Sequence, residues 1–311
     1  PGKPLGSQIG ARLIVSSNRE RNDRKSGRKP PPRSRAEEPA KPGRKGDRAA
    51  APDPWDAKPA REPGRDKGRD RLDPDSLIWG RHPVLAALAN PARQGMGRLM
   101  ATADRAAELE RDKLLNGHAV EVVDGDRLAR LLPPGAVHQG LVFKVKPLEG
   151  VDLDDLAHPA RGILVMLDQL TDPQNVGAIF RSALAFGARG IIVQDRHSPA
   201  LAGPLAKTAA GATERLPCAR VTNLSRALRT LQEAGWHIVG LEGEGDMTLD
   251  EALDGRPTVL VMGSEGDGLR RLVAENCDTL ARIPMPGGFE SLNVSNAAAV
   301  ALYEASRKQT G

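Results

Sequence analysis

The sequence is poor in aromatic residues, cysteine and long apolar runs, and each shortage excludes a class of protein. Phe, Trp and Tyr make up only 3% of the 311 residues, so a base-stacking platform rich in aromatic rings is not expected. The two cysteines, Cys218 and Cys277, stand far apart and form no C-x-x-C motif, which favours two reduced, buried thiols over a disulfide or a metal site. No apolar run is long enough for a membrane span, and no histidine cluster suggests a metal. We therefore expect a cytoplasmic protein that works without a metal.

Positive charge is concentrated at the N-terminal end. The net charge of the chain is +5, but residues 1–76 alone hold 20 Lys and Arg against 12 Asp and Glu, which leaves the remainder slightly acidic. Residues 1–75 are rich in Arg, Lys, Pro and Gly, and they cannot bury enough apolar surface to offset chain entropy. We predict a disordered basic tail. Two interpretations stay open, a passive solvating extension and an arm that attracts RNA phosphates through counterion release.

Apolar periodicity begins at Leu77 and predicts two folded parts. Short strands and helices over residues 76–148 predict a small α/β domain, and residues 151–159 are typical of a linker. Over residues 160–311, nearly continuous apolar runs alternate with helical patterns, which predicts a parallel sheet covered on both faces. The strands expected in this part lie at 162–168, 190–193, 237–241, 258–263 and 279–284. The helices expected between and after them lie at 176–186, 205–211, 224–234 and 296–308. In the small domain we expect a helix at 104–115 and a strand at 138–145.

Three polar, glycine-rich segments follow strands of the expected parallel sheet. They span residues 168–177, 263–269 and 283–295, and ligands of such sheets bind beyond the carboxyl ends of the strands. Three such ends in one sheet suggest one composite pocket. The sequence has no G-x-G-x-x-G after a strand, no P-loop motif and no G-x-S-x-G, which argues against a nicotinamide cofactor, nucleotide hydrolysis and a serine hydrolase.

Each polar residue in these segments also has a structural interpretation. Asn175 fits the N-cap of the helix that follows it. Arg181 fits a surface cation on that helix, Glu265 fits a turn flanked by glycines, and the glycines of the third segment fit simple turns.

Taken together, the segments resemble the three motifs of the SpoU/TrmH family of RNA 2′-O-ribose methyltransferases, which belongs to the SPOUT superfamily. The resemblance is carried by residues 175–181 (NVGAIFR), 261–269 (VMGSEGDGL), and 283–285 (IPM) with 290–298 (ESLNVSNAA). Residues 137–141 (VHQGL) resemble the end of the small RNA substrate-binding domain found in RlmB-like 23S rRNA guanosine-2′-O-methyltransferases. The resemblance covers the chain from about Leu77 to the C-terminus, whereas nothing in the tail matches.

The resemblance implies a fold, a cofactor and an assembly. The C-terminal domain would be a trefoil-knotted parallel sheet, which plain pattern reasoning would not propose. S-adenosyl-L-methionine would bind in the knot without a metal, and the protein would be a homodimer with its active site near the subunit interface. The residues expected to hold the cofactor, largely through backbone groups, are Gly263, Ile283, Leu292, Gly266 and Met262.

The resemblance also implies a set of catalytic residues, namely Arg181, Asn175, Glu265, Ser291 and Asn293. We expect Arg181 to act as an electrostatic clamp on the developing oxyanion or the adjoining phosphate, because a guanidinium does not readily lose a proton. Glu265 and Asn293 would position Arg181 or the ribose, and Asn175 and Ser291 would complete the polar network. The expected substrate is a guanosine ribose in 23S rRNA. A tRNA 2′-O-methyltransferase and a catalytically inactive RNA-binding module remain alternatives.

Overall fold

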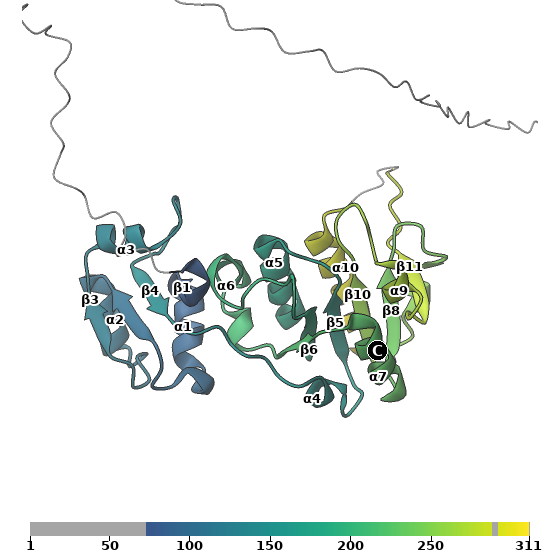
Figure 1. The fold of residues 1–311 in the computed structure, drawn as a ribbon, viewed down its shortest axis with the longest axis horizontal. Coiled ribbons are helices and arrows are strands. Elements are labelled where there is room, and N and C mark those ends of the chain that lie inside the picture. Colours follow the sequence, from purple (N-terminus) through teal and green to yellow (C-terminus); the bar gives the residue numbers. More distant parts are fainter. Residues whose placement is uncertain (1–72, 288–291, 311) are drawn as a thin grey trace, which may run out of the picture. The chain divides into compact units, whose positions relative to one another are not determined.

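The computed structural model describes residues 73–287 and 292–310 of the chain. These residues lie within the second of two compact units, which spans residues 62–311. The expected basic tail lies outside the described residues, except for Asp73, Pro74 and Asp75, and Ser291 lies outside them as well. The unit contains two sheets. Residues 73–144 form the small-sheet region, and residues 163–310 form the large-sheet region (Figure 1).

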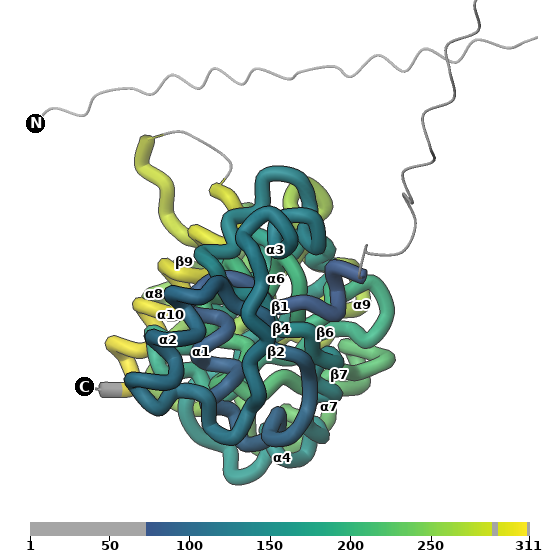
Figure 2. The backbone as a smooth tube through the Cα atoms, turned by 90° about the vertical axis from the view of Figure 1, so that its left-hand side faces the viewer, coloured from purple at the N-terminus to yellow at the C-terminus, as the bar shows by residue number. Residues whose placement is uncertain are grey.

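The small-sheet region is a four-stranded sheet with the strand order β1-β4-β2-β3. Strand β4 runs antiparallel to both β1 and β2, whereas β2 and β3 are parallel. Figure 2 shows β1, β4 and β2 side by side. Its strands are β1 (Leu77–Trp79), β2 (Arg98–Ala101), β3 (Val120–Val122) and β4 (Leu141–Lys144). Its helices are α1 (Arg81–Ala89), α2 (Ala103–Arg111) and α3 (Gly125–Leu131), with short 3-10 turns η1 (Pro74–Ser76) and η2 (Pro91–Arg93).

The large-sheet region confirms the expected parallel α/β fold. Its seven strands are all parallel, in the order β7-β6-β5-β10-β8-β11-β9. They are β5 (Ile163–Leu167), β6 (Gly190–Gln194), β7 (Cys218–Val221), β8 (His237–Leu241), β9 (Met247–Thr248), β10 (Thr258–Met262) and β11 (Thr279–Arg282). The helices are α5 (Pro173–Ala185), α6 (Gly203–Ala209), α7 (Leu224–Glu233), α8 (Leu249–Ala252), α9 (Arg271–Ala274) and α10 (Val294–Thr310), with the 3-10 turn η3 (Ala212–Glu214). The trefoil knot stays a prediction.

Alternating side chains of the central strands pack into two separate hydrophobic cores, one on each face of the sheet. Val165 of β5 packs in a core with α5, α6, α8 and α10, whereas its neighbour Leu164 packs in a core with α4 (Leu153–Ala157), α7 and α9. Figure 1 shows α5 and α10 on one side of the strands and α4 and α7 on the other. A strand that is buried on both faces needs apolar residues at every position, which explains the unbroken apolar run at residues 163–167.

Several expected boundaries are wrong, and the backbone explains most of them. The strand expected at 138–145 begins only at Leu141, because Gln139 and Gly140 have φ values of 54° and 78° that an extended chain does not adopt. The helix expected at 104–115 ends at Arg111, just before Lys113 with φ 56°. The linker expected at 151–159 contains helix α4. Strand β7 was not expected at all.

The two sheet regions are joined by a buried ion pair. Arg93 donates from Nε and Nη2 to the two carboxylate oxygens of Glu214, at 2.7 and 2.8 Å. The side chains of Arg93 and Glu214 are only 4% and 1% exposed. Asn90 adds a hydrogen bond of 2.8 Å to the same carboxylate, and Ala206 of α6 packs into the core of the small-sheet region. The contact therefore combines charge, hydrogen bonds and apolar burial.

Within the part of the chain that the structure describes, no helix has the length and apolar character needed to cross a membrane. Cys218 is buried and Cys277 is partly buried, and both are free thiols, as expected except that Cys277 keeps some exposure.

Candidate functional site

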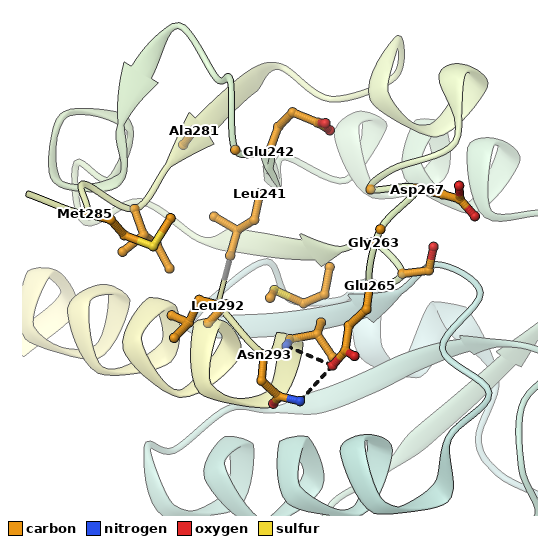
Figure 3. A pocket seen from close by; sticks show the side chains of 17 residues that line it. Leu241, Glu242, Gly263, Glu265, Asp267, Ala281, Met285, Leu292 and Asn293 are labelled. Atoms are coloured by element: carbon orange, nitrogen blue, oxygen red, sulfur yellow. Dashed lines mark hydrogen bonds between the residues drawn. The ribbon is translucent and has the colours of Figure 1, made fainter. Parts of the chain in front are cut away.

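A cavity of about 740 Å³ opens at the carboxyl ends of β8, β10 and β11 (Figure 3). Apolar side chains and glycines make up most of its lining, which also includes three acidic residues. The lining residues are Leu241, Glu242, Gly243, Met262, Gly263, Ser264, Glu265, Gly266, Asp267, Gly268, Ala281, Ile283, Met285, Leu292, Asn293, Val294 and Ala297. Its size falls in the range of small-molecule and cofactor sites. The second and third polar segments of the sequence thus meet at one cavity.

The segment after β10 folds back on itself to form one wall of this cavity. The backbone N–H and C=O groups of Ser264 and Gly268 bond each other in both directions, at 3.0 and 3.1 Å. A Cβ atom on Gly263 would lie 2.2 Å from the carbonyl carbon of Gly268, far inside van der Waals contact. Only glycine therefore permits this close approach of the two backbone segments.

Asp168 anchors the same segment through hydrogen bonds to Arg270. It is the first residue after β5, and it is fully buried. Its carboxylate accepts from the backbone N–H of Arg270 at 2.9 Å and from Arg270 Nε at 2.7 Å. Its own N–H donates to the Met262 carbonyl at 2.8 Å. Asp168 was not among the expected site residues, although an acid that ends an apolar strand is a visible signal.

Asn175, Glu265 and Asn293 form a hydrogen-bonded cluster from three distant parts of the chain. Glu265 Oε1 accepts from Asn175 Nδ2 at 3.0 Å, from Asn293 Nδ2 at 2.7 Å and from the Val294 N–H at 3.3 Å. Asn293 Nδ2 also donates to Asn175 Oδ1 at 3.1 Å. No hydrogen bond uses Glu265 Oε2 among the residues that the structure describes, so this oxygen is available to a ligand.

The orientation of the Asn293 amide is fixed by its other partners. Asn293 Oδ1 accepts from the Ser295 N–H at 3.0 Å and from Ser295 Oγ at 2.6 Å, at the start of α10. The oxygen must face these donors, so Nδ2 must face the acceptor oxygen of Glu265. The start of α10 and the cluster are therefore held by one side chain.

The N-cap interpretation of Asn175 is wrong. Helix α5 begins at Pro173, and its N-cap is Asp172, whose side chain accepts from the Gln174 N–H at 3.0 Å. Asn175 thus lies inside the first turn of α5, and its side-chain amide donates a hydrogen bond to Glu265. Glu265 does lie in a turn, as its structural interpretation expected, but the turn alone does not account for its three hydrogen bonds.

The remaining expected residues divide into two groups. All five residues expected to hold the cofactor, Gly263, Ile283, Leu292, Gly266 and Met262, line the cavity. Arg181 does not line it. It is an exposed residue of α5 and makes no hydrogen bond or ion pair within residues 73–287 and 292–310. The first polar segment therefore reaches the site through Asn175, which bonds Glu265, and through Asp168, which anchors one wall of the cavity.

The cavity suits a nucleoside-containing ligand. Leu241, Met262, Ile283 and Leu292 offer an apolar surface for a purine ring, while Gly243 and Gly266 leave open space where a Cβ atom would stand. Among the lining residues that were not expected at the site are Leu241 and Glu242. Their position at the end of an apolar strand was the signal, because the carboxyl ends of parallel strands converge on the ligand.

Comparison with known proteins places this geometry in a family. Residues 162–303 match the family model described as the SpoU rRNA Methylase family, and residues 77–151 match the model described as RNA 2′-O ribose methyltransferase substrate binding. A protein named as an uncharacterized tRNA/rRNA methyltransferase from Mycobacterium sp. (strain KMS) is 42% identical over 262 residues, covering 81% of this chain and 82% of the relative. The chain belongs to the SpoU methylase family.

Two solved methyltransferase structures agree with this assignment. The SpoU methyltransferase AviRb from Streptomyces viridochromogenes, solved in complex with the cofactor AdoMet, superposes with a TM-score of 0.63 at 29% identity, over 76% of this chain and 90% of AviRb. The AdoMet-bound rRNA methyltransferase from Sinorhizobium meliloti gives a TM-score of 0.61 at 28% identity, over 74% and 86% of the two chains. The predicted family is confirmed, and with it an RNA methyltransferase whose family uses S-adenosylmethionine.

Proposed function

We propose that this SpoU protein transfers a methyl group from S-adenosylmethionine to a ribose 2′-hydroxyl of RNA. The observation that carries the proposal is the cluster of Asn175, Glu265 and Asn293 at the edge of an apolar, glycine-lined cavity. The match of residues 77–151 to a substrate-binding model of RNA 2′-O ribose methyltransferases supports RNA as the acceptor. When bound, the cofactor would supply an electrophilic methyl group to the hydroxyl oxygen, with S-adenosylhomocysteine and the hydroxyl proton as the leaving groups.

The protein's part in this reaction is to bind, orient and stabilise. Gly263, Gly266, Met262, Ile283 and Leu292 would hold the cofactor in the cavity. A ribose hydroxyl is a weak nucleophile, so the site must hold it in line with the methyl carbon and stabilise the charge that develops on oxygen.

The polar groups that surround the acceptor would divide this work. Glu265, held by two asparagines, would fix the acceptor through its unused Oε2. Arg181 would stabilise the oxyanion or the adjoining phosphate, and Ser291 would complete the polar network.

The substrate and the assembly are also proposals. We favour a guanosine of 23S rRNA, because the small-sheet region accompanies the catalytic part as in RlmB-like enzymes. The mycobacterial relatives are named for both tRNA and rRNA, which keeps tRNA as the alternative. A homodimer in the cytoplasm is part of the proposal, since Arg181 stands outside the cavity of its own chain and would reach a reacting ribose at a subunit interface. We also propose the division of the chain into a basic tail (1–75), a substrate-binding domain (76–148) and a methyltransferase domain (160–311).

The deciding experiment maps 2′-O-methyl groups in total RNA from cells with and without the gene. Loss of methylation at one 23S rRNA guanosine is the expected result. Loss at a tRNA ribose would favour the alternative, and an unchanged map would contradict the proposed activity.

Cofactor binding is tested separately by calorimetry with the purified protein in the presence of a metal chelator. We expect S-adenosylmethionine to bind under these conditions. Binding that appears only after a divalent ion is added would contradict the proposed metal-free site.

A further inference from the structure

The carboxylate of Glu242 is an unused charged group inside the cavity. Glu242 is the first residue after β8, it is half-buried, and it lines the cavity. Within residues 73–287 and 292–310, no side chain or backbone group donates a hydrogen bond to this carboxylate, and no cation pairs with it. A carboxylate that is partly removed from water without a partner costs free energy, which a ligand with hydrogen-bond donors would offset.

The position of this carboxylate is set by a glycine. An ideal Cβ on Gly268 would lie 3.0 Å from Glu242 Oε1 and 3.5 Å from Oε2, so the carboxylate rests against the Gly268 backbone. Gly268 has φ of +66° and belongs to the segment that folds back beside Gly263. The carboxylate therefore lies between the ends of two strands, β8 and β10, where parallel sheets bind nucleotides.

The two ends of the cavity carry different chemistry. Figure 3 shows Glu242 on the opposite side of the cavity from Glu265 and Asn293, with the apolar side chain of Leu241 between them. Glu265 and Asn293 belong to the cluster assigned above to the acceptor hydroxyl, so the methyl group must be presented at that end. Glu242 then stands at the end left for the nucleoside part of the cofactor.

We infer that Glu242 accepts hydrogen bonds from the ribose 2′- and 3′-hydroxyls of the bound cofactor. A carboxylate offers two acceptor oxygens side by side, which matches two vicinal hydroxyl donors. Acidic residues near the ends of parallel strands serve the same purpose in dinucleotide-binding sheets. The inference rests on the proposed function, because it takes S-adenosylmethionine as the ligand of this cavity.

The test is calorimetric titration of wild type, Glu242→Gln and Glu242→Ala with three ligands: S-adenosylmethionine, S-adenosylhomocysteine and 2′-deoxy-S-adenosylhomocysteine. We expect Glu242→Ala to weaken S-adenosylmethionine and S-adenosylhomocysteine equally, by about tenfold or more, as for a lost hydrogen bond to a charged group. The 2′-deoxy ligand should already bind wild type more weakly and should lose less from the substitution. Glu242→Gln keeps one acceptor oxygen and should fall in between.

A matched control is Glu244→Ala. Glu244 carries the same charge two residues further along the chain, but it is exposed and does not line the cavity. Its loss should leave all three affinities within about twofold. Thermal melting of each variant checks that the fold is intact.

Three outcomes would overturn the inference. Weakened binding of S-adenosylmethionine alone would show that Glu242 senses the positive sulfonium instead of the ribose. Equal loss for all three ligands would assign Glu242 a purely structural role, and unchanged affinities would exclude it from the site. Failure of the wild type to bind any of the ligands would instead contradict the proposed function itself.

Discussion

At the scale of single residues, Asn293 uses every hydrogen-bonding group of its side chain. Its oxygen caps α10 and its nitrogen donates to Glu265 and Asn175. Aspartate would serve the cap equally well, because both residues are good N-caps. An amide can cap the helix and donate to a carboxylate at the same time, which an ionised aspartate cannot, and this explains asparagine in place of aspartate at this position.

Replacing Asn293 with aspartate should therefore separate catalysis from stability. In Asn293→Asp, two carboxylates would face each other where a hydrogen bond of 2.7 Å now lies. Displacement of Glu265 by this repulsion should lower single-turnover methylation by about a hundredfold, as for a misplaced catalytic group. Asn296→Asp adds the same charge to the same turn of α10 at an exposed site and is the control. Equal rates for the two variants would contradict a role of the cluster in the reaction.

Loss of the Arg181 side chain should lower the methylation rate and leave cofactor affinity almost unchanged. Arg181→Ala should lower single-turnover methylation by about a hundredfold to a thousandfold, the usual cost of losing one oxyanion donor. Cofactor affinity should change by less than a few-fold, because Arg181 does not line the cavity. Arg181→Lys should rescue poorly, since an ammonium lacks the planar fork of donors. Near-normal turnover in Arg181→Ala would remove this residue from the mechanism and leave Glu265 as the leading candidate.

The control for the Arg181 substitution is Arg226, another exposed arginine, which lies in the first turn of α7. Arg226→Ala removes the same charge from another helix of the large-sheet region. Its methylation rate should stay close to that of the wild type.

The two thiols should be inert near neutral pH. Burial raises the pKa of Cys218 and of Cys277 to about 12, so both stay protonated where thiolates would otherwise form. Iodoacetamide at pH 8 should modify both residues in urea and neither in the folded protein, as read by mass spectrometry. Because the pKa values are raised on folding, the thiols favour the folded state below about pH 8.5, and this contribution is lost as the pH rises towards 12. Rapid modification of the folded protein would contradict these shifts.

At the scale of elements, the segment from Gly263 to Arg270 depends on its anchor. Asp168→Asn keeps the shape of the side chain but loses the charged bond to Arg270. We expect the free energy of unfolding in urea to fall by about 1.5–3 kcal/mol, the range for hydrogen bonds to charged groups. Cofactor affinity should fall as well, because the segment lines the cavity.

The control for this substitution is Asp254→Asn. Asp254 pairs with Arg256, but their side chains are 47% and 56% exposed, and such surface pairs contribute little. If Asp254→Asn destabilised the protein as much as Asp168→Asn, burial would not be the reason for the effect.

The elements that the sequence predicted are those with strong apolar periodicity. Strands β5 and β10 have nearly unbroken apolar runs, and their covered, parallel arrangement followed from that pattern. Strand β7 escaped prediction because it is a short run, CARV, with a charged residue inside it. The ends of helix α2 and strand β4 escaped because left-handed residues such as Lys113 and Gln139 carry no distinctive signal in the sequence.

For the site, the motifs identified the residues but not their partners. The cavity lining of Gly263 and Leu292 follows from the family resemblance, whereas the bond between Asn175 and Glu265 joins residues 90 positions apart. The strand-end positions of Asp168 and Glu242 were a signal in the sequence, but their contacts could not be derived, since each depends on what the fold places beside it. Tertiary contacts of this kind have no local signature.

At the scale of the whole molecule, deleting residues 1–72 tests the basic tail. We expect the fold and cofactor affinity to be retained, because the described cavity and both sheets lie in residues 73–310. RNA affinity should fall, and its dependence on salt should become shallower, because fewer phosphate contacts release counterions. Binding measured over a range of salt concentrations decides between the two interpretations of the tail. An unchanged slope would show that the tail is passive.

The ion pair of Arg93 and Glu214 also bears on how the protein chooses a nucleotide. Separating the two sheet regions at this point would break the contact between two charges that are almost completely buried. A hinge motion here would therefore cost free energy. RNA held by the small-sheet region would then meet the cavity at a set separation. The enzyme would then select a ribose by its distance from the RNA element that the small-sheet region binds, because that distance must match the separation between this region and the catalytic cluster. The identity of the base would matter less than this distance within the folded RNA.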